Sequence, residues 1–215
     1  MLKDSGIHFI AIEGVIGVGK TTLAQIIAER WNAMCIEENF DKNPFLEKFY
    51  ENPEAYAFQT QLFFLLDRHK QLQNSALQSD LFHDLLVSDY TYDKDQIFAS
   101  QNLSDSEYAM YETVARSLDK DIPKPDLVVY LQASVPTLLS RIRGRGRSME
   151  KAIEGNYLKD LQERYDHHFW HYTSAPVLII NTDKIDFVHN ENHLNLILDA
   201  ISACPTQTTY FVPEG

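Results

Sequence analysis

The residues with the clearest chemistry form one segment near the start of the chain. They follow the pattern Gly-x-x-x-x-Gly-Lys-Thr, which is the phosphate-binding loop (P-loop) of nucleotide-binding proteins. Glycines allow such a loop to point its backbone N–H groups at phosphate oxygens, and the helix that follows adds its positive N-terminal end. We expect Lys20 to reach the β- and γ-phosphates of ATP and the Thr21 hydroxyl to bind Mg²⁺. The segment expected to bind ATP comprises Gly14, Val15, Ile16, Gly17, Val18, Gly19, Lys20, Thr21 and Thr22.

A P-loop alone does not say what happens to the phosphate, since GTPases, motors, transporter ATPases and small-molecule kinases all use one. A GTPase would carry Asn-Lys-x-Asp after a late strand to recognise guanine. The sequence at that place is Asn181-Thr182-Asp183-Lys184, which has the wrong order. The chain of 215 residues also lacks long accessory regions. Both observations favour a small-molecule kinase.

Transfer of a phosphoryl group to a hydroxyl needs a base and a second ligand for the metal. Glu37 and Glu38 follow one expected strand, and Asp89 follows the next. Because the carboxyl ends of parallel strands face the ligand crevice, one of the two glutamates and Asp89 should point into it. On spacing alone, a solvated glutamate pair and a turn-forming aspartate remain open alternatives.

Charge on the transferring phosphoryl group also calls for cations. Four arginines occur within seven residues, with Gly144 and Gly146 between them, in a chain whose formal net charge is −12. A solvated helix face is the ordinary explanation of such a run. Alternating glycines favour a mobile lid over about 143–150 that closes over ATP and excludes water. The arginines are Arg141, Arg143, Arg145 and Arg147.

The elements that must position these residues alternate between strand and helix along the chain. Short apolar runs predict strands over 7–12, 33–36, 85–88, 126–131 and 177–180. Helical spacing, prolines and a capping box at Ser104 predict helices over 20–31, 53–79, 104–119, 135–143, 156–172 and 193–203, with a further helix opening at 43–44. This order predicts an α/β protein with the P-loop kinase fold, whose five-stranded parallel sheet has helices on both faces. We expect one domain over 1–215 with a loose tail after residue 205.

The composition narrows the cellular context and the partners. The charge of −12 argues against a nucleic-acid polymer or an anionic membrane as partner. No apolar run is long enough to span a membrane, and no signal-peptide pattern is present. The two cysteines, Cys35 and Cys204, are expected to be reduced thiols of a cytoplasmic protein. His167, His168 and His171 are expected to be surface residues, because no third metal ligand accompanies the helical pair.

Between about Phe9 and Tyr172 the sequence resembles the deoxyribonucleoside kinase family, and most closely its bacterial deoxyguanosine and deoxyadenosine kinases. The matching segments are 9–14 before the P-loop, 38–50, 124–131 and 141–150. The resemblance implies that Glu38, not Glu37, is the base for the substrate 5′-hydroxyl. It also implies that Tyr50 and Glu150 bind the 3′-hydroxyl. Arg141, Arg145 and Arg147 stand at the lid's phosphate-contacting positions.

Further roles follow from the same resemblance. Phe58-Gln59 is similar to the pair whose glutamine amide contacts the nucleobase edge, and Asp95 and Phe98 are similar to the base-contacting aspartate and the stacking ring. Asp89-Tyr90-Thr91 stands where the family has an acidic-Arg-Ser motif. The acid is retained, so Mg²⁺ binding is expected of Asp89, whereas Tyr90 does not inherit the arginine's role. Arg68 together with Gln59 and Asp95 suggests a purine, and the loop at Asp186 and Phe187 is similar to the one that holds the ATP adenine.

The sequence therefore predicts an ATP- and Mg²⁺-dependent kinase that phosphorylates the 5′-hydroxyl of a purine deoxyribonucleoside in nucleotide salvage. Deoxyguanosine is the favoured substrate and deoxyadenosine the next. The family suggests a homodimer, for which the helices over 53–79 and 104–119 could supply the interface. One alternative is a nucleoside monophosphate kinase such as thymidylate kinase, against which Tyr90 argues because that acceptor needs an additional arginine. The other is a nucleotide-binding protein without turnover, against which the base, the metal acid and the lid argue together.

Overall fold

The computed structural model describes residues 6–119 and 122–212, without the side chains of 76–82. All strands run parallel in one sheet with the order β2-β3-β1-β4-β5-β6. The five expected strands are confirmed with shifts of one or two residues at their ends. The strands are β1 (Phe9–Gly14), β2 (Met34–Ile36), β3 (Leu86–Ser88), β4 (Leu127–Gln132), β5 (Val177–Asn181) and β6 (Thr209–Phe211).

The sixth strand corrects two expectations, the five-stranded sheet and the loose tail after residue 205. β6 pairs with β5 from Leu178↔Thr209 to Ile180↔Phe211. It was missed because it is short and lies at the sheet edge, where Tyr210 is 56% exposed. Its backbone hydrogen bonds hold it there without the buried apolar run by which the inner strands were recognised.

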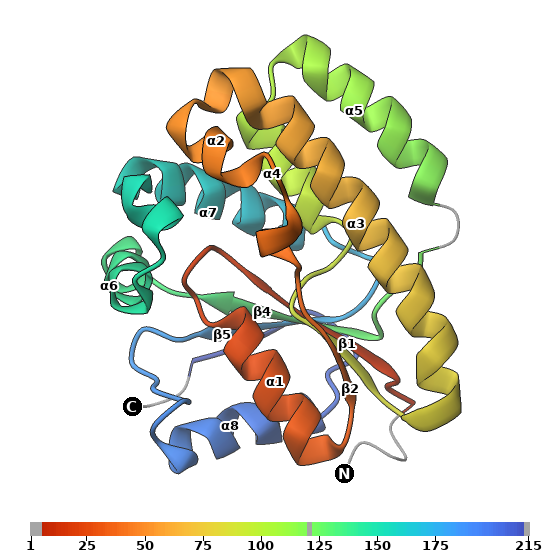
Figure 1. The fold of residues 1–215 in the computed structure, drawn as a ribbon. Coiled ribbons are helices and arrows are strands. Elements are labelled where there is room, and N and C mark those ends of the chain that lie inside the picture. Colours follow the sequence, from red (N-terminus) through yellow and green to blue (C-terminus); the bar gives the residue numbers. More distant parts are fainter. Residues whose placement is uncertain (1–5, 120–121, 213–215) are drawn as a thin grey trace.

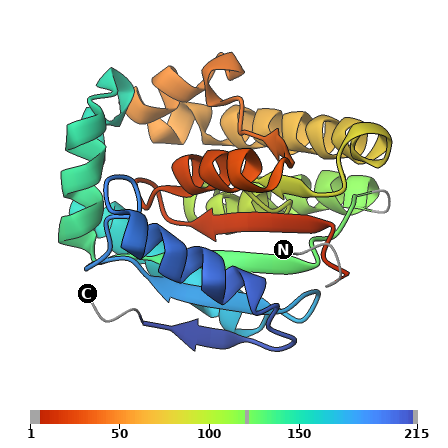
Figure 2. The ribbon, with the colours of Figure 1, turned by 90° about the horizontal axis from the view of Figure 1, so that it is seen from below.

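Helices cover both faces of the sheet, as expected. Figure 1 shows α1 and α8 on one face, and α3, α4 and α7 on the other, and Figure 2 shows the same layers from below. The helices are α1 (Lys20–Trp31), α2 (Leu46–Glu51), α3 (Pro53–Phe82), α4 (Lys94–Asn102), α5 (Asp105–Leu118), α6 (Val135–Arg145), α7 (Gly155–Trp170) and α8 (Glu191–Ser202), with the 3₁₀ helices η2 (Phe40–Lys42) and η4 (Ser148–Ala152). None of the described helices is both long and apolar enough to cross a lipid bilayer.

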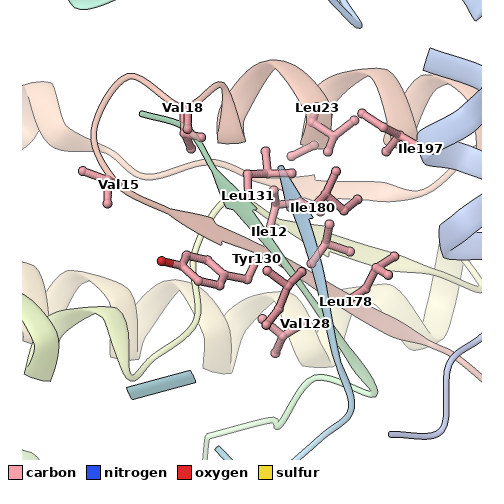
Figure 3. Packing of buried hydrophobic residues seen from close by; sticks show 14 of the residues in the cluster. Ile12, Val15, Val18, Leu23, Val128, Tyr130, Leu131, Leu178, Ile180 and Ile197 are labelled. Carbon is pink, nitrogen blue, oxygen red and sulfur yellow. The ribbon is translucent and has the colours of Figure 1, made fainter. Parts of the chain in front are cut away.

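The core lies between the central strands and the helices above and below them. Figure 3 shows side chains of β1, β4 and β5 packed with Leu23 of α1 and Ile197 of α8. Tyr130 of β4 stacks on Phe169 of α7, with ring centroids 4.9 Å apart. Burying these side chains removes apolar surface from water and fixes the sheet on which the loops of the site are mounted.

Two helical segments differ from the sequence expectations. The helix α4 was not predicted, because two of its four buried residues are the charged Lys94 and Asp95, so it lacks an apolar period. The lid was expected to be a loop from residue 143, but α6 continues through Gly144 to Arg145. Only Gly146 ends the helix, with φ 72°, and η4 follows directly. The capping box of α5 is confirmed, since Ser104 and Glu107 are both engaged.

Candidate active site

The P-loop lies at the carboxyl end of β1, which is flanked in the sheet by β3 and β4. The strands β2 and β3 lie on one side of β1, and the chain then continues with β4 on the other side. Ligands of open parallel sheets bind where the strand order changes direction in this way. Gly19 has φ 108°, and a Cβ there would lie 2.8 Å from the Phe187 ring. The glycine therefore allows both the turn of the loop and the close approach of Phe187.

Lys20 faces the inside of this loop. Its ammonium donates hydrogen bonds to the carbonyl oxygens of Gly14, at 2.7 Å, and Val15, at 3.2 Å. Burial and, to a smaller extent, the nearby charge of Lys94 together lower the pKa of Lys20 to about 8. A phosphate group would supply the negative charge that favours the protonated form, so the position suits Lys20 for the role predicted from the sequence.

Asp89 and Thr21 come together across the loop, as predicted for a pair of metal ligands. The Thr21 hydroxyl donates a hydrogen bond to Asp89 Oδ2, and the backbone N–H of Glu38 donates to Asp89 Oδ1 at 2.9 Å. A hydroxyl and a carboxylate are hard oxygen ligands of the kind that Mg²⁺ prefers, and Mg²⁺ often takes only one or two of them from the protein. The residues present therefore fit Mg²⁺.

Glu38 rather than Glu37 points into the site. Glu37 is exposed and accepts a hydrogen bond from Gln25. Glu38 Oε1 lies 2.5 Å from Arg68 Nη2, and Oε2 lies 2.7 Å from Lys94 Nζ. Burial alone would raise the pKa of Glu38, but the charges of Lys94 and Arg68 hold it well below its ordinary value. Glu38 is therefore ionised and can accept a proton once a ligand loosens these contacts.

Asp95 supports Arg68 and does not line the cavity of the site. It is fully buried, forms an ion pair with Arg68 Nη1 and accepts a hydrogen bond from the Tyr111 hydroxyl at 2.8 Å. Both of its oxygens are thus occupied by the protein. The predicted direct contact of Asp95 with the nucleobase stays a prediction, and the cavity is lined by its partner Arg68.

Gln61, and not the predicted Gln59, lies in the cavity. Gln59 is exposed, whereas Gln61 is 2% exposed and lines the cavity that also contains Glu38 and Arg68. Both glutamines belong to α3. A side chain seven residues before Arg68 lies on the same face of the helix, about two turns away, and one nine residues before lies on the opposite face. Applying this spacing to the sequence would have selected Gln61.

The lid also contributes side chains to the wall of the cavity. Arg145 and Arg147 both pair with the buried Glu150, at 2.6 and 3.3 Å. The Arg147 guanidinium also lies 3.8 Å from the centre of the Phe40 ring. Tyr50 lines the cavity beside them, and burial raises its pKa, so its hydroxyl stays protonated and can donate. Tyr50 and Glu150 are thus brought together as predicted.

Arg141, the remaining predicted lid arginine, is held away from this cavity. It donates to the carbonyl oxygens of Val18, at 3.1 Å, and Thr182, at 2.8 Å. These bonds join the end of the P-loop to the loop after β5. The predicted contact of Arg141 with phosphate stays a prediction, and the structure adds a positioning role for this residue.

The remaining predicted residues divide between the site and its surroundings. Phe98 lines the cavity and meets the Tyr165 ring edge-on at 6.2 Å. Phe187 is buried against Gly19. Asp186 accepts hydrogen bonds from the backbone of residues 188 and 189 and thereby closes its own loop. Whether Asp186 and Phe187 hold an adenine stays a prediction.

Sequence reasoning gave Glu13 no role, although its carboxylate connects three parts of the site. One oxygen accepts hydrogen bonds from the backbone N–H of Thr91, at 2.6 Å, and from its hydroxyl, at 2.9 Å. The other accepts from Gly14 N and from the Tyr165 hydroxyl, both at 3.2 Å. The fully buried Glu13 thus ties the P-loop to the loop that carries Asp89. The signal available in the sequence was a charged residue inside an otherwise apolar strand.

The expectation that all three histidines are surface residues is wrong for His168. His167 and His171 are exposed, as expected, but His168 is largely buried beside Phe169, and its Nε2 has no hydrogen-bond partner among the described residues. No group of three metal-binding side chains of the His, Cys, Asp or Glu type occurs within residues 6–119 and 122–212. Cys35 and Cys204 are both free.

A larger groove of about 1120 Å³ lies beside the site, lined mainly by α4 and α7. It shares Phe49, Tyr50 and Tyr157 with the cavity of the site but contains neither the P-loop nor Glu38. We place the chemistry in the smaller cavity, because it brings together Lys20, Thr21 and Asp89 with Glu38.

A P-loop, an oxygen pair suited to a metal, an ionised carboxylate and an arginine-bearing lid around one cavity define a P-loop phosphotransferase. Residues 10–204 match the family model described as deoxynucleoside kinase. The chain belongs to the deoxynucleoside kinase family.

Individual members of the family resemble the chain over most of its length. It is 39% identical to the deoxyguanosine kinase of Bacillus subtilis over 193 residues, covering 88% of this chain and 93% of that protein. It is 33% identical to the deoxyadenosine kinase of Lactobacillus acidophilus, and the match covers 91% of this chain and 95% of that protein. The solved structure of deoxyadenosine kinase from M. mycoides with bound dCTP matches with a TM-score of 0.77 at 26% identity. The match covers 91% of this chain and 99% of that one.

Proposed function

We propose that this kinase transfers the γ-phosphoryl group of ATP to the 5′-hydroxyl of a purine deoxyribonucleoside in nucleotide salvage, with deoxyguanosine preferred and deoxyadenosine next. The observation that carries the proposal is a single cavity that is lined by Lys20 and Glu38 and also by Gln61. Gln61 Oε1 and Thr60 Oγ1 are buried and lack hydrogen-bond partners within the described residues. Buried polar atoms are normally paired, so these two indicate a ligand with polar edges.

In the proposed reaction, Glu38 accepts the proton of the 5′-hydroxyl while the 5′-oxygen attacks the γ-phosphorus. The bond between the γ-phosphorus and the bridging oxygen breaks, and its electron pair leaves with ADP. Tyr50 and Glu150 bind the 3′-hydroxyl, and Arg145 and Arg147 are released from Glu150 toward the phosphates. The protein acts mainly by positioning and by charge stabilisation.

The proposal includes Mg²⁺, which Thr21 and Asp89 would hold together with the phosphates. When bound, the metal neutralises charge on the phosphate oxygens. The Thr21–Asp89 hydrogen bond supports this assignment, because it shows that a hydroxyl oxygen of the P-loop and a carboxylate oxygen lie side by side.

The choice of a purine is supported by the relatives, among which deoxyguanosine and deoxyadenosine kinases align along most of the chain. The experiment is phosphate transfer from ATP to deoxyguanosine, deoxyadenosine, deoxycytidine, thymidine and thymidine monophosphate at equal concentrations. We expect the highest kcat/KM with deoxyguanosine. Activity confined to thymidine monophosphate would support the monophosphate kinase alternative.

The two glutamines of α3 provide a matched pair for testing base recognition. We expect Gln61→Ala to lower kcat/KM for the purine nucleoside by about 10- to 100-fold, because a hydrogen bond to a buried base edge is lost. Gln59→Ala, which truncates an exposed side chain on the opposite face of the same helix, should leave kcat/KM unchanged. Equal effects of the two substitutions would contradict the placement of Gln61.

The proposal extends to assembly and location. We propose a homodimer in the cytoplasm. The dimer is supported by exposed apolar side chains on the two helices that the sequence suggested for the interface: Leu66 of α3 is 48% exposed and Met110 of α5 is 62% exposed. Free thiols at Cys35 and Cys204 agree with a reducing compartment. The charge of −12 argues against a nucleic-acid polymer as partner. Light scattering, which measures the mass in solution, tests the dimer.

A further inference from the structure

Lys94 is a buried cation in the site that the sequence did not single out. It is the first residue of α4, and its side chain is 5% exposed. Its ammonium lies 2.7 Å from Glu38 Oε2 and 6.0 Å from the centre of the Phe98 ring. It lines the same cavity as Lys20. Burying an ammonium is unfavourable unless it is paired, so this position requires an explanation.

The hydrogen bonds of Lys94 leave room for a ligand. An ammonium carries three N–H donors. Within the part of the chain that the structure describes, the side chain of Lys94 makes one hydrogen bond, to Glu38. Two donors therefore remain beside the P-loop. A group with several negatively charged oxygens, such as a phosphoryl group, would satisfy them.

The other cations of the site are already engaged. Arg68 is shared between Glu38 and Asp95, both lid arginines are paired with Glu150, and Lys20 is bonded to P-loop carbonyl oxygens. Position 90, where the family motif has arginine, supplies no charge. The Tyr90 ring is fully buried, and its hydroxyl donates to Gln71 Oε1 at 2.5 Å. Lys94 thus contacts the proposed base and still has donors available.

We propose that Lys94 is a catalytic residue that stabilises the γ-phosphoryl oxygens during transfer. This inference rests on the proposed function. In the unliganded site, Lys94 balances the charge of Glu38. During transfer the 5′-oxygen bonds to the γ-phosphorus, the bond to the bridging oxygen breaks with its electron pair on ADP, and the hydroxyl proton passes to Glu38. Glu38 becomes neutral at that moment, so the charge of Lys94 is available for the phosphoryl oxygens.

The movement of Lys94 from Glu38 to the phosphoryl oxygens explains why the proposed base, Glu38, makes such close contacts in the unliganded protein. The pair Arg68 and Lys94 balances the pair Glu38 and Asp95, which keeps all four buried charges compensated before substrate binds. Lys94 can move toward a phosphate without leaving Glu38 unpaired, because Arg68 Nε and Nη2 both remain on Oε1. Binding of ATP is thus linked to release of the base.

The test is Lys94→Gln, since glutamine keeps an N–H donor for Glu38 but has no charge. We expect kcat to fall by roughly 100-fold, as on loss of one charge-stabilising donor, while the Kd for deoxyguanosine changes less than threefold. Lys159→Gln, which removes an exposed lysine on α7, is the matched control and should keep wild-type kcat. Lys94→Met is measured in parallel, so that a folding defect of one variant does not decide the result.

The split between kcat and nucleoside binding separates a catalytic role from a merely structural one. Lys94 lines the same cavity as Tyr50 and Gln61, so a structural role would weaken deoxyguanosine binding and kcat together. Wild-type kcat in Lys94→Gln, or a loss of nucleoside binding equal to the loss of kcat, would overturn the role of Lys94. Absence of transfer by the wild-type enzyme would instead overturn the proposed function.

Discussion

Replacing Glu38 by glutamine should lower kcat by about 100- to 10,000-fold, the range that a positioned general base contributes. Glutamine keeps the size of the side chain, and its amide oxygen can still accept a hydrogen bond from one of the two cations, Arg68 or Lys94, but it cannot take up the 5′-hydroxyl proton. We therefore expect deoxyguanosine to bind nearly as well as to the wild type. Steady-state kinetics with ATP and calorimetric titration of the nucleoside measure the two quantities separately.

The neighbouring Glu37 supplies the control for this experiment. It is exposed, and within the described residues its carboxylate is hydrogen-bonded only to Gln25. Glu37→Gln makes the same chemical change one residue away and should leave kcat within about twofold of wild type, because surface substitutions rarely disturb a site. If both variants turned over normally, neither glutamate would be the base, and the proton would have to leave by another route.

Replacing Arg68 by methionine should destabilise the fold by about 3–5 kcal/mol, the cost of removing one partner from a buried ion pair. Arg68 is 3% exposed and contacts two carboxylates, those of Glu38 and the fully buried Asp95. Without it, the Tyr111 hydroxyl is the one side-chain partner that Asp95 keeps among the residues that the structure describes. Urea denaturation measures the free energy of unfolding. Arg116→Met removes an exposed ion pair on α5 and should change it by less than about 0.5 kcal/mol.

The loss of stability in Arg68→Met should depend on pH with a definite sign. Burial raises the pKa of Asp95 to about 6, and Arg68 acts against this rise. Removing Arg68 therefore raises the pKa of Asp95 further above its value in the unfolded chain. A carboxyl group with a raised pKa in the folded state costs stability at high pH, and the cost disappears as it is protonated. The deficit relative to wild type should be smaller at pH 5 than at pH 8, and a larger deficit at pH 5 would contradict this account.

The residues that sequence alone predicted well are those whose chemistry requires a fixed spacing. The P-loop needs glycines and a lysine in a set order, and Asp89 and Glu38 each follow a buried strand, so the topology of a parallel sheet brings them together. Tyr50 and Glu150 were assigned through the family resemblance, and the structure places both beside the same cavity.

The residues that sequence missed are positioned by tertiary contacts. Lys94 lies on a helix without an apolar period, so neither the helix nor the direction of its side chain was evident. The ion pair of Asp95 with Arg68 likewise depends on how α3 and α4 pack. Gln61 is the exception, because helical spacing from Arg68 would have identified it. The strand β6 depends on pairing with β5 and has no buried apolar pattern of its own.

The most direct test of the central claim is identification of the product formed from ATP and deoxyguanosine by ³¹P NMR. The account predicts deoxyguanosine 5′-monophosphate and ADP in equal amounts, with the new phosphorus coupled to the two 5′-protons of the sugar. Hydrolysis of ATP to free phosphate with the nucleoside unchanged would contradict it. So would transfer that occurs only when the acceptor already carries a 5′-phosphate.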